Sequence, residues 1–347
     1  MASDYDIQTK TYVKSRISNA VGYELPLLNL AMQNQNGTAT GKGVEWFIQK
    51  DDLSGNAQAG GPFTPIVARR KNILAAASLP WSFCWNTDLL TLAEYTTTRK
   101  QTWTDESFVT KRGEAILEGL KIAIDRQLWG LDGIGSDSAL TFKSIRQMLG
   151  HDVTFGGLAR ATTVTNAFHQ SASLARTFAD QDTEEKISVD LLRRIRAACG
   201  RTRKNADGKQ GLVHFCGEEL WLALQRELTS YVGYRPEGFM SKLGFGFEDF
   251  EVDKDSVVKV NSLYDANYKG TETTYPSRWL ISVDPSVVNM MLHPEHAFSV
   301  GYDDGEMWHP QNTQQGGNHT YLGEVNVMGA WFIDLCNRCC MKTNVRA

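Results

Sequence analysis

The chain has 347 residues, of which 41% are hydrophobic and 22% are charged, and its formal net charge at pH 7 is -4. This length and composition suffice to bury a large hydrophobic core, as one large domain or two ordinary ones, and they exclude wholesale disorder. The chain is negatively charged overall and lacks the excess of basic residues that is typical of proteins that bind nucleic-acid backbones. This argues against a duplex-binding protein.

The N-terminal part of the sequence predicts an arm followed by the first strand of a long β-hairpin. Residues 1–43 are polar and rich in turn-forming residues, with one short helix expected around Leu27–Met32. From Val44 onward, successive residues alternate between two faces of a strand, with Trp46 on one face and Phe47 on the other. Both faces of this strand therefore carry an aromatic side chain.

A second extended run at Ile66–Ala68 predicts the return strand, which carries Arg69 and Arg70 and continues to Trp85. A long segment rich in Gly, Ser, Asn and Ala separates the two strands. A two-stranded ribbon has no core of its own and is only marginally stable in water. We therefore expect the ribbon to pack against another surface.

Residues 104–129 show the clearest helical pattern in the chain. Thr104 is a candidate N-cap, and the acidic residues that follow it lie where the helix dipole favours negative charge. Apolar residues at helical spacing form one stripe, consisting of Val109, Ile116, Leu117, Leu120, Ile124 and Leu128. Charged residues occupy the opposite face, namely Lys111, Arg112, Glu114, Glu118, Lys121 and Asp125. The pattern predicts a helix about twice as long as the average one.

The remainder predicts an α+β protein with antiparallel sheets rather than a regular βαβ alternation. Expected helices are Phe142–Leu149, Val189–Cys199 with Ser188 as its N-cap, and Glu218–Tyr231. Expected strands are Leu212–Cys216, Phe247–Val252, Val257–Val260, Trp279–Val283, Ala297–Val300, Tyr321–Asp334 and Leu335–Met341.

Two motifs contain metal-ligating side chains at spacings that do not match a known metal site. Cys336, Cys339 and Cys340 lack the second pair of ligands that a closed tetrahedral zinc site needs, so we predict buried apolar side chains. His293 and His296 lie in a "HPEHAF" segment, where Pro294 prevents the helical spacing of a zincin. The sequence therefore predicts neither a metal site nor a cofactor.

His214 and Cys216 alternate on one face of a predicted strand, which leaves a cysteine hydrolase open as an alternative of another class. Nothing in the sequence marks a third residue that would orient the imidazole. A packed core thiol is the favoured interpretation, and no Gly-x-Ser-x-Gly elbow is present. We therefore predict a protein that is not an enzyme.

The basic run from Arg193 to Lys204 lies partly on a predicted amphipathic helix whose apolar residues are committed to packing. A solvated face, or salt bridges to a neighbouring subunit, is favoured over nucleic-acid contact because no aromatic residues are interleaved. The six cysteines are too irregularly spaced for a disulfide framework. Together with an N-terminus that lacks an apolar signal core, they indicate a cytosolic compartment, and no apolar run reaches the length of a membrane span.

The order of these elements resembles the major capsid proteins of tailed bacteriophages, which have the Hong Kong 97-type shell fold. The segments "GLDGIGSDSALTFKSIRQML" and "TFGGLARATTVTNAFHQS" are similar to the stretch that follows the spine helix in several phage coat proteins. The resemblance implies an N-terminal arm (1–43), an extended β-hairpin or E-loop (44–85), a P-domain (86–187) with spine helix 104–129, an A-domain (188–282) and return strands of the P-domain (283–347).

The family resemblance implies a structural protein that assembles with copies of itself into hexamers and pentamers of an icosahedral shell around phage double-stranded DNA. It implies a place in the virion capsid after assembly in the cytoplasm of the host bacterium. Separate scaffolding and portal proteins, with a decoration protein as a further candidate, are the expected partners. The DNA would be enclosed without sequence-specific binding, and no membrane is involved.

In this family the ribbon would lie across a neighbouring subunit. We expect it to bury Trp46 and Phe47 there and to set Arg69 and Arg70 against acidic groups of that subunit. An encapsulin, a bacterial nanocompartment shell protein with the same fold, is the nearest alternative. The extra length of the present chain favours the phage shell.

Overall fold

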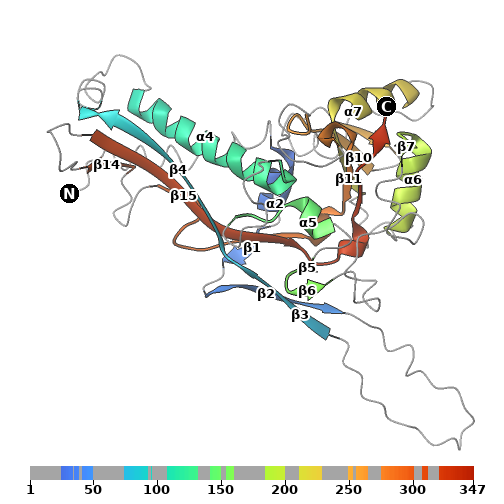
Figure 1. The fold of residues 1–347 in the computed structure, drawn as a ribbon, viewed down its shortest axis with the longest axis horizontal. Helices are drawn as coiled ribbons and strands as arrows, with labels where there is room; N and C mark the ends of the chain where they lie inside the picture. Colours follow the sequence, from blue (N-terminus) through green and yellow to red (C-terminus); the bar gives the residue numbers. More distant parts are fainter. Residues whose placement is uncertain are drawn as a thin grey trace, which may run out of the picture.

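The computed structural model describes residues 25–33, 35–38, 41–49, 74–92, 95, 108–131, 141–149, 154–159, 184–199, 211–228, 249–252, 255–264, 275–300, 307–311 and 320–347. These residues form two hydrophobic cores. The larger core lies beneath a long helix and a long sheet, and the smaller one lies under two helices at the other end of the molecule (Figure 1).

The larger sheet is organised around one long strand, β15 (Thr320–Ile333). One edge of β15 pairs antiparallel with β4 (Ser82–Thr91). Its remaining partners are β12 (Val288–Leu292), β13 (Ser299–Val300) and β14 (Trp308–Gln311), and β1 (Gln35–Thr38) pairs in parallel with β12. The predicted strand at Tyr321–Asp334 is confirmed as β15, to within a residue at each end.

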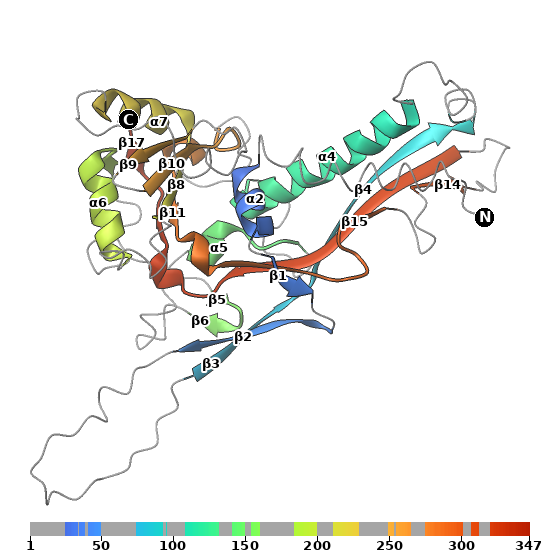
Figure 2. The ribbon, with the colours of Figure 1, turned by 180° about the vertical axis from the view of Figure 1, so that it is seen from behind.

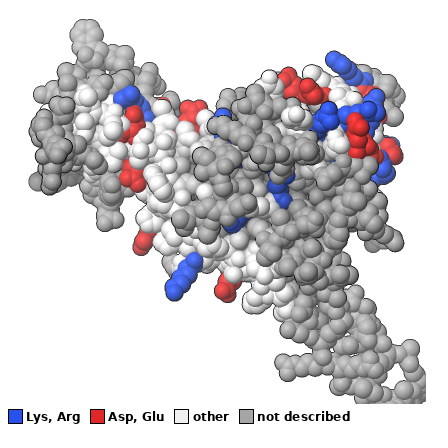
Figure 3. Space-filling view, viewed as in Figure 1, with Lys and Arg blue, Asp and Glu red and all other residues white. Residues whose placement is uncertain are grey.

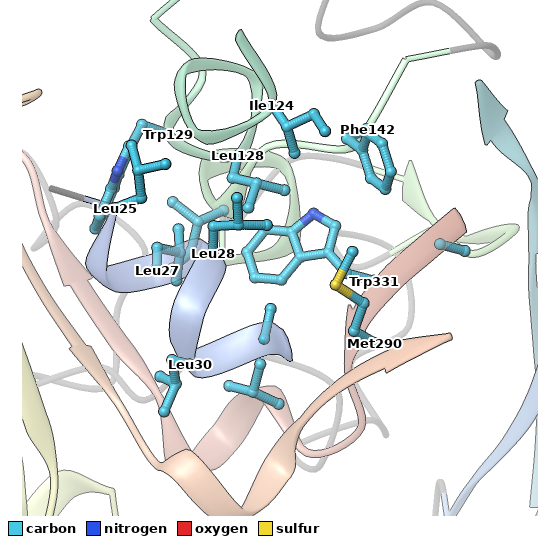
Figure 4. Close-up of a cluster of buried hydrophobic side chains, with 14 of the residues drawn as sticks. Leu25, Leu27, Leu28, Leu30, Ile124, Leu128, Trp129, Phe142, Met290 and Trp331 are labelled. Atoms are coloured by element: carbon cyan, nitrogen blue, oxygen red, sulfur yellow. The ribbon is translucent and has the colours of Figure 1, made fainter. Parts of the chain in front are cut away.

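The long helix predicted at 104–129 is confirmed as α4 (Phe108–Trp129), while Thr104 lies outside the described residues. α4 runs along β4 and β15 (Figure 1). The predicted short helix is α2 (Pro26–Gln33). Its leucines are buried, and Leu27 and Leu28 lie near Leu128 of α4 and Trp331 of β15 (Figure 4). Within the range expected to be an arm, α2 thus belongs to the core, because it carries apolar residues that only a core can bury, and β1 belongs to the larger sheet.

The predicted ribbon is present as β2 (Gly43–Gln49) paired antiparallel with β3 (Leu74–Pro80). The predicted return strand at Ile66–Ala68 lies outside the described residues. One face of the ribbon packs on the turn between β5 (Thr154–Phe155) and β6 (Leu158–Ala159), where the Ser78 amide donates a 3.0 Å hydrogen bond to the Gly156 carbonyl.

The smaller core is built on a five-stranded sheet in the order β16 (Cys340–Lys342), β11 (Leu280–Val283), β8 (Val213–Cys216), β10 (Asp255–Lys259) and β9 (Asp249–Val252). Helices α6 (Val189–Ala198) and α7 (Glu218–Leu228) pack with it (Figure 2). Ser188 caps α6 as predicted, since its Oγ accepts a 3.1 Å hydrogen bond from the Leu191 amide. β8 and β10 pair in parallel, because β9 runs antiparallel to β10 and returns the chain to the end of the sheet where β8 begins. The expectation of antiparallel sheets therefore holds only in part.

The C-terminal residues differ from the prediction of a continuous strand at Leu335–Met341. A 3-10 helix, η6 (Cys336–Arg338), precedes β16, because the Cys339 amide bonds to the Cys336 carbonyl at 3.0 Å and closes a turn. The last strand, β17 (Val345–Arg346), pairs in parallel with β7 (Glu185–Lys186). The chain end therefore joins the region of α6 rather than the larger sheet. The remaining short helices are α5 (Ile145–Leu149), η4 (Pro276–Arg278) and η5 (Pro285–Val287). Among the described helices, none combines the length and apolarity needed to cross a membrane.

Candidate assembly surface

The two faces of the β4–β15 pair have different surroundings. Cys84 and Asn86 point toward α4, where the Asn86 amide donates a 2.8 Å hydrogen bond to the Ile116 carbonyl. Asp88 faces the same helix and pairs with Arg112 at 3.3 Å. Since successive side chains of a strand alternate, the intervening residues of β4 point away from α4.

We call the side of the pair that faces away from α4 the open face. It is made of Phe83, Trp85, Thr87 and Leu89 of β4, and of Met328, Asn326, Glu324 and Leu322, which lie directly opposite them on β15. Trp85 is 60% exposed and Leu89 is 57% exposed. The Phe83 and Trp85 rings lie 5.4 Å apart, so the aromatic side chains form one contiguous apolar patch. A contiguous exposed apolar patch of this kind is typical of a surface that binds another protein.

Charges of both signs gather near α6 and β7, and separate charged side chains are also visible over the region of α4, β4 and β15 (Figure 3). Near α6, Arg194 pairs with Glu185 and, at 3.2 Å, with Asp190. The predicted basic run is thus neutralised in part by acids of its own chain, and its members after residue 199 lie outside the described residues. An apolar surface with few charges favours a protein partner over a nucleic acid.

The four residues predicted to contact a neighbouring subunit have different outcomes. Trp46 is only 8% exposed, and its ring stacks on Phe332 at 4.3 Å. The expectation that its pocket lies on another chain is therefore wrong, because β15 and the β5–β6 turn already fill that role. Phe47 is 73% exposed, so its contact with a neighbour stays a prediction. Arg69 and Arg70 lie outside the described residues.

Sequence reasoning missed Trp85 and Leu89, although a signal was present. The segment Ser82–Thr91 carries apolar side chains on both faces, since Cys84 and Leu90 alternate with Phe83, Trp85 and Leu89. A strand with two apolar faces is expected to be covered on both. In the described part of the chain, α4 covers one face only.

The hydrolase alternative is not supported by the surroundings of Cys216. Burial raises the pKa of the Cys216 thiol to about 12, so the nucleophilic thiolate is strongly disfavoured. His214 instead contacts Ser282 Oγ through Nδ1 at 2.7 Å and Asp255 through Nε2 at 3.6 Å. This Ser-His-Asp arrangement is completely enclosed, and Asp255 also accepts a 2.8 Å hydrogen bond from the Leu212 amide. A buried network of this kind joins β8, β10 and β11 and offers no access to a substrate.

The two metal-ligand motifs also differ in outcome. Cys336, Cys339 and Cys340 are buried as predicted, and burial raises the pKa of Cys340 to about 12. His293, Glu295 and His296, for which the sequence predicts no site, come together with their ligating atoms within 4.8 Å of one another. They do so on a turn between β12 and β13 rather than on a helix.

Lys121 and Asp125 depart from their predicted place on the charged, exposed face of α4. Lys121 is 2% exposed and Asp125 is 0% exposed. Asp125 accepts hydrogen bonds from Trp129 Nε1 at 3.0 Å and from Ser262 Oγ at 3.2 Å. Burial raises the pKa of Asp125 to about 7, although these hydrogen bonds act to lower it. The carboxyl thus links the helix of the larger core to the chain beyond β10.

Searches with protein-family models and against curated proteins found no match to the sequence. Solved structures do match. The chain is similar to a protein of the cyanophage A-1(L) capsid asymmetric unit, with 11% sequence identity, a TM-score of 0.65 and coverage of 93% of each chain.

Two further capsid structures resemble the chain at a lower TM-score of 0.51. In the mature capsid of bacteriophage PhiM1, the likeness covers 90% of this chain and 85% of that one at 7% identity. In the capsid of an empty GTA particle, it covers 91% and 90% at 8% identity. The chain therefore has the α+β fold of phage capsid proteins, the Hong Kong 97-type fold expected from the order of its elements.

Proposed function

We propose that the chain is the major capsid protein of a tailed bacteriophage, which assembles with its own copies into hexamers and pentamers of an icosahedral shell. The observation that carries this proposal is the likeness to the cyanophage A-1(L) capsid protein over 93% of both chains. A match of this extent means that almost the whole chain is used to build the capsid fold. Little of the chain is left over for a separate catalytic domain.

The open face supplies the contact area that such an assembly needs. A Trp side chain buries about 150–250 Å² when fully enclosed. Covering the exposed part of Trp85 would therefore contribute roughly 3 kcal/mol at about 25 cal/mol per Å². Contacts of this kind repeat around a closed ring of identical subunits, so a small gain for each subunit acts on the whole shell.

The remaining parts of the proposal follow from the same role. The function is structural rather than enzymatic, and the shell encloses double-stranded DNA without reading its sequence. Its location is the virion, with assembly in the cytoplasm of the host bacterium. Scaffolding, portal and decoration proteins would be separate chains.

Electron microscopy of the purified full-length protein, wild type and Trp85→Ala, tests this function. We expect the wild type to form closed particles and the variant to need a roughly tenfold or higher protein concentration to do so, since each 1.4 kcal/mol of lost contact energy is a factor of ten. Leu222→Ala is the matched control, because Leu222 is also an exposed apolar residue but lies on α7. Both variants should melt as unassembled subunits near the wild-type temperature.

A wild-type protein that stays monomeric at high concentration, alone and with its genomic neighbours co-expressed, would contradict the proposal. Particles that form equally well with Trp85→Ala would leave the shell intact but remove the open face as its contact. Portal and terminase genes next to the coding sequence support a phage capsid. A peroxidase-type cargo gene there would instead support an encapsulin.

A further inference from the structure

A turn connects β12 to β13 along the edge of β15. β12 ends with Leu292 opposite Gly329, and β13 begins with Ser299 opposite Asn326. Six residues, 293–298, thus face the short stretch of β15 around Met328. Two backbone hydrogen bonds hold the turn there, from the His293 amide to the Met328 carbonyl at 2.9 Å and from the Met328 amide to the His296 carbonyl at 2.8 Å.

This turn fixes the backbone positions of two histidines. A further hydrogen bond of 3.2 Å joins the His296 amide to the His293 carbonyl. Phe298, just beyond, has a φ of 53°, a left-handed conformation that a non-glycine residue adopts only when its surroundings impose it. The turn is therefore a constrained part of the sheet edge rather than a loose loop.

The side chains of the turn converge on one point. The two imidazole rings lie 5.7 Å apart, and the ligating atoms of His293, Glu295 and His296 all lie within 4.8 Å of one another. Each imidazole makes an edge-to-face contact with an aromatic ring. The centroid of His293 lies 5.9 Å from that of Trp81, and the centroid of His296 lies 6.0 Å from that of Phe83. Glu295 is exposed, whereas both histidines are half-buried.

We propose that this turn binds a divalent transition metal ion of the zinc class through the two imidazoles and the carboxylate. Two His and one Glu form a donor set typical of zinc, and three protein ligands leave a coordination position open for water or another ligand. Imidazole donors favour zinc, copper and nickel over calcium and magnesium, which prefer oxygen ligands. The site does not depend on the proposed capsid function.

The hydrogen bonds of the turn indicate which atom of His293 would bind the ion. Its Nδ1 accepts a long hydrogen bond of 3.4 Å from the Glu295 amide, so the free lone pair of the ring is on Nδ1 and an ion bound there would replace this hydrogen bond. Ligands bound at 2.0–2.1 Å in a tetrahedron lie about 3.4 Å apart, so the side chains must close by about 1.4 Å from their present spread. Rotation of the exposed Glu295 side chain can supply much of that movement.

The ion would lie at the end of the open face, because Phe83 contacts both His296 and Trp85. Its open coordination position would then be close to the surface that we propose for subunit contact. Metal binding can be measured on unassembled subunits, so its failure and the failure of the capsid proposal are distinguishable.

Titration of metal-free, full-length protein with Co²⁺, followed by displacement with Zn²⁺, tests the site. We expect one Co²⁺ per chain with visible d–d absorption, which Zn²⁺ abolishes. His293→Ala and His296→Ala should each weaken binding at least tenfold, and Glu295→Gln, at an exposed position, should weaken it without disturbing the fold. His309→Ala is the control, because His309 lies on β14 toward the opposite end of β15 and should leave binding unchanged.

Three results would overturn the proposal. The first is absence of a stoichiometric Co²⁺ spectrum in the wild type. The second is retention of wild-type affinity in His293→Ala, His296→Ala and Glu295→Gln when all three are folded by circular dichroism. The third is a sulfur-to-cobalt charge-transfer band, which would assign the ion to a cysteine instead.

Discussion

Replacing Asp125 by Asn should remove a pH dependence of folding stability that the wild-type chain shows. Asp125 lies on α4 with its carboxyl completely buried, and Trp129 Nε1 and Ser262 Oγ donate hydrogen bonds to Oδ2. Burial raises the pKa of this carboxyl to about 7. Asn has nearly the same shape and stays neutral, so it keeps the packing and removes the titration.

The direction of the effect follows from the two pKa values. In the unfolded chain an Asp carboxyl titrates near pH 4. Between about pH 4 and pH 7 the folded protein therefore holds a proton that the unfolded chain has released, and the free energy of unfolding falls as the pH rises. The contribution of Asp125 is fully present below the unfolded pKa and is lost as the pH passes through 7. Three pKa units at about 1.4 kcal/mol each give roughly 4 kcal/mol over the whole window.

Urea unfolding of unassembled subunits between pH 5 and about pH 7.5 measures this difference. In that range the wild type should lose roughly 2–3 kcal/mol more stability than Asp125→Asn. The upper limit stays below the pKa of Lys121, which burial lowers to about 8. Asp190→Asn is the control for the exchange of a carboxylate for an amide, because Asp190 is exposed on α6. Equal slopes for Asp125→Asn and the wild type would refute a protonated carboxyl in the native core.

The ribbon gives two further predictions, both read from the unfolding of unassembled subunits. Trp46→Ala should cost about 3–5 kcal/mol of stability, because the ring is buried against Phe332 in its own chain; an unchanged stability together with lost particle formation would restore a pocket on a neighbour. Gly156→Ala should destabilise the protein more than Gly157→Ala, although both glycines have a positive φ. An added Cβ at Gly156 would lie 3.0 Å from Ala77 Cβ and 3.1 Å from Trp46 Cη2, whereas a Cβ at Gly157 would have nothing within 4 Å. Backbone strain alone should lower the free energy of unfolding of each glycine variant by about 1–2 kcal/mol. Equal losses in the two variants would show that the β5–β6 turn does not pack tightly on the ribbon.

Local signals in the sequence predict the elements well where a single stretch of chain decides the outcome. The apolar stripe of α4 is enough to predict a long helix, and the hydroxyl of Ser188 is enough to predict the start of α6. The two-residue alternation likewise predicts β2. In these elements the periodicity, the cap and the final structure agree.

Contacts between distant segments account for what the sequence could not predict. Lys121 and Asp125 carry charge and follow the polar side of the helical pattern, yet Ser262 and α2 cover that side of α4. The two-residue strands β7 and β17 are too short to show any alternation in the sequence. They are strands because the two segments, distant in the chain, pair with each other. The His293 cluster depends on how the turn is pinned to Met328, which no local spacing reveals.

The positions of the exposed apolar residues indicate that β4, rather than the base of the ribbon, needs a contact with a neighbouring molecule. The base of the ribbon needs no second molecule to bury its apolar side chains, because Trp46 and Ile48 are already buried within their own chain. Trp85 and Leu89 are different, since they stand on β4, whose other face is already committed to α4. Turning β4 to bury them would expose Cys84 and Leu90, because a strand alternates its side chains between two faces. Within the described part of the chain Trp85 and Leu89 stay more than half exposed. We therefore infer that β4 reaches its full burial only when a second molecule packs on it.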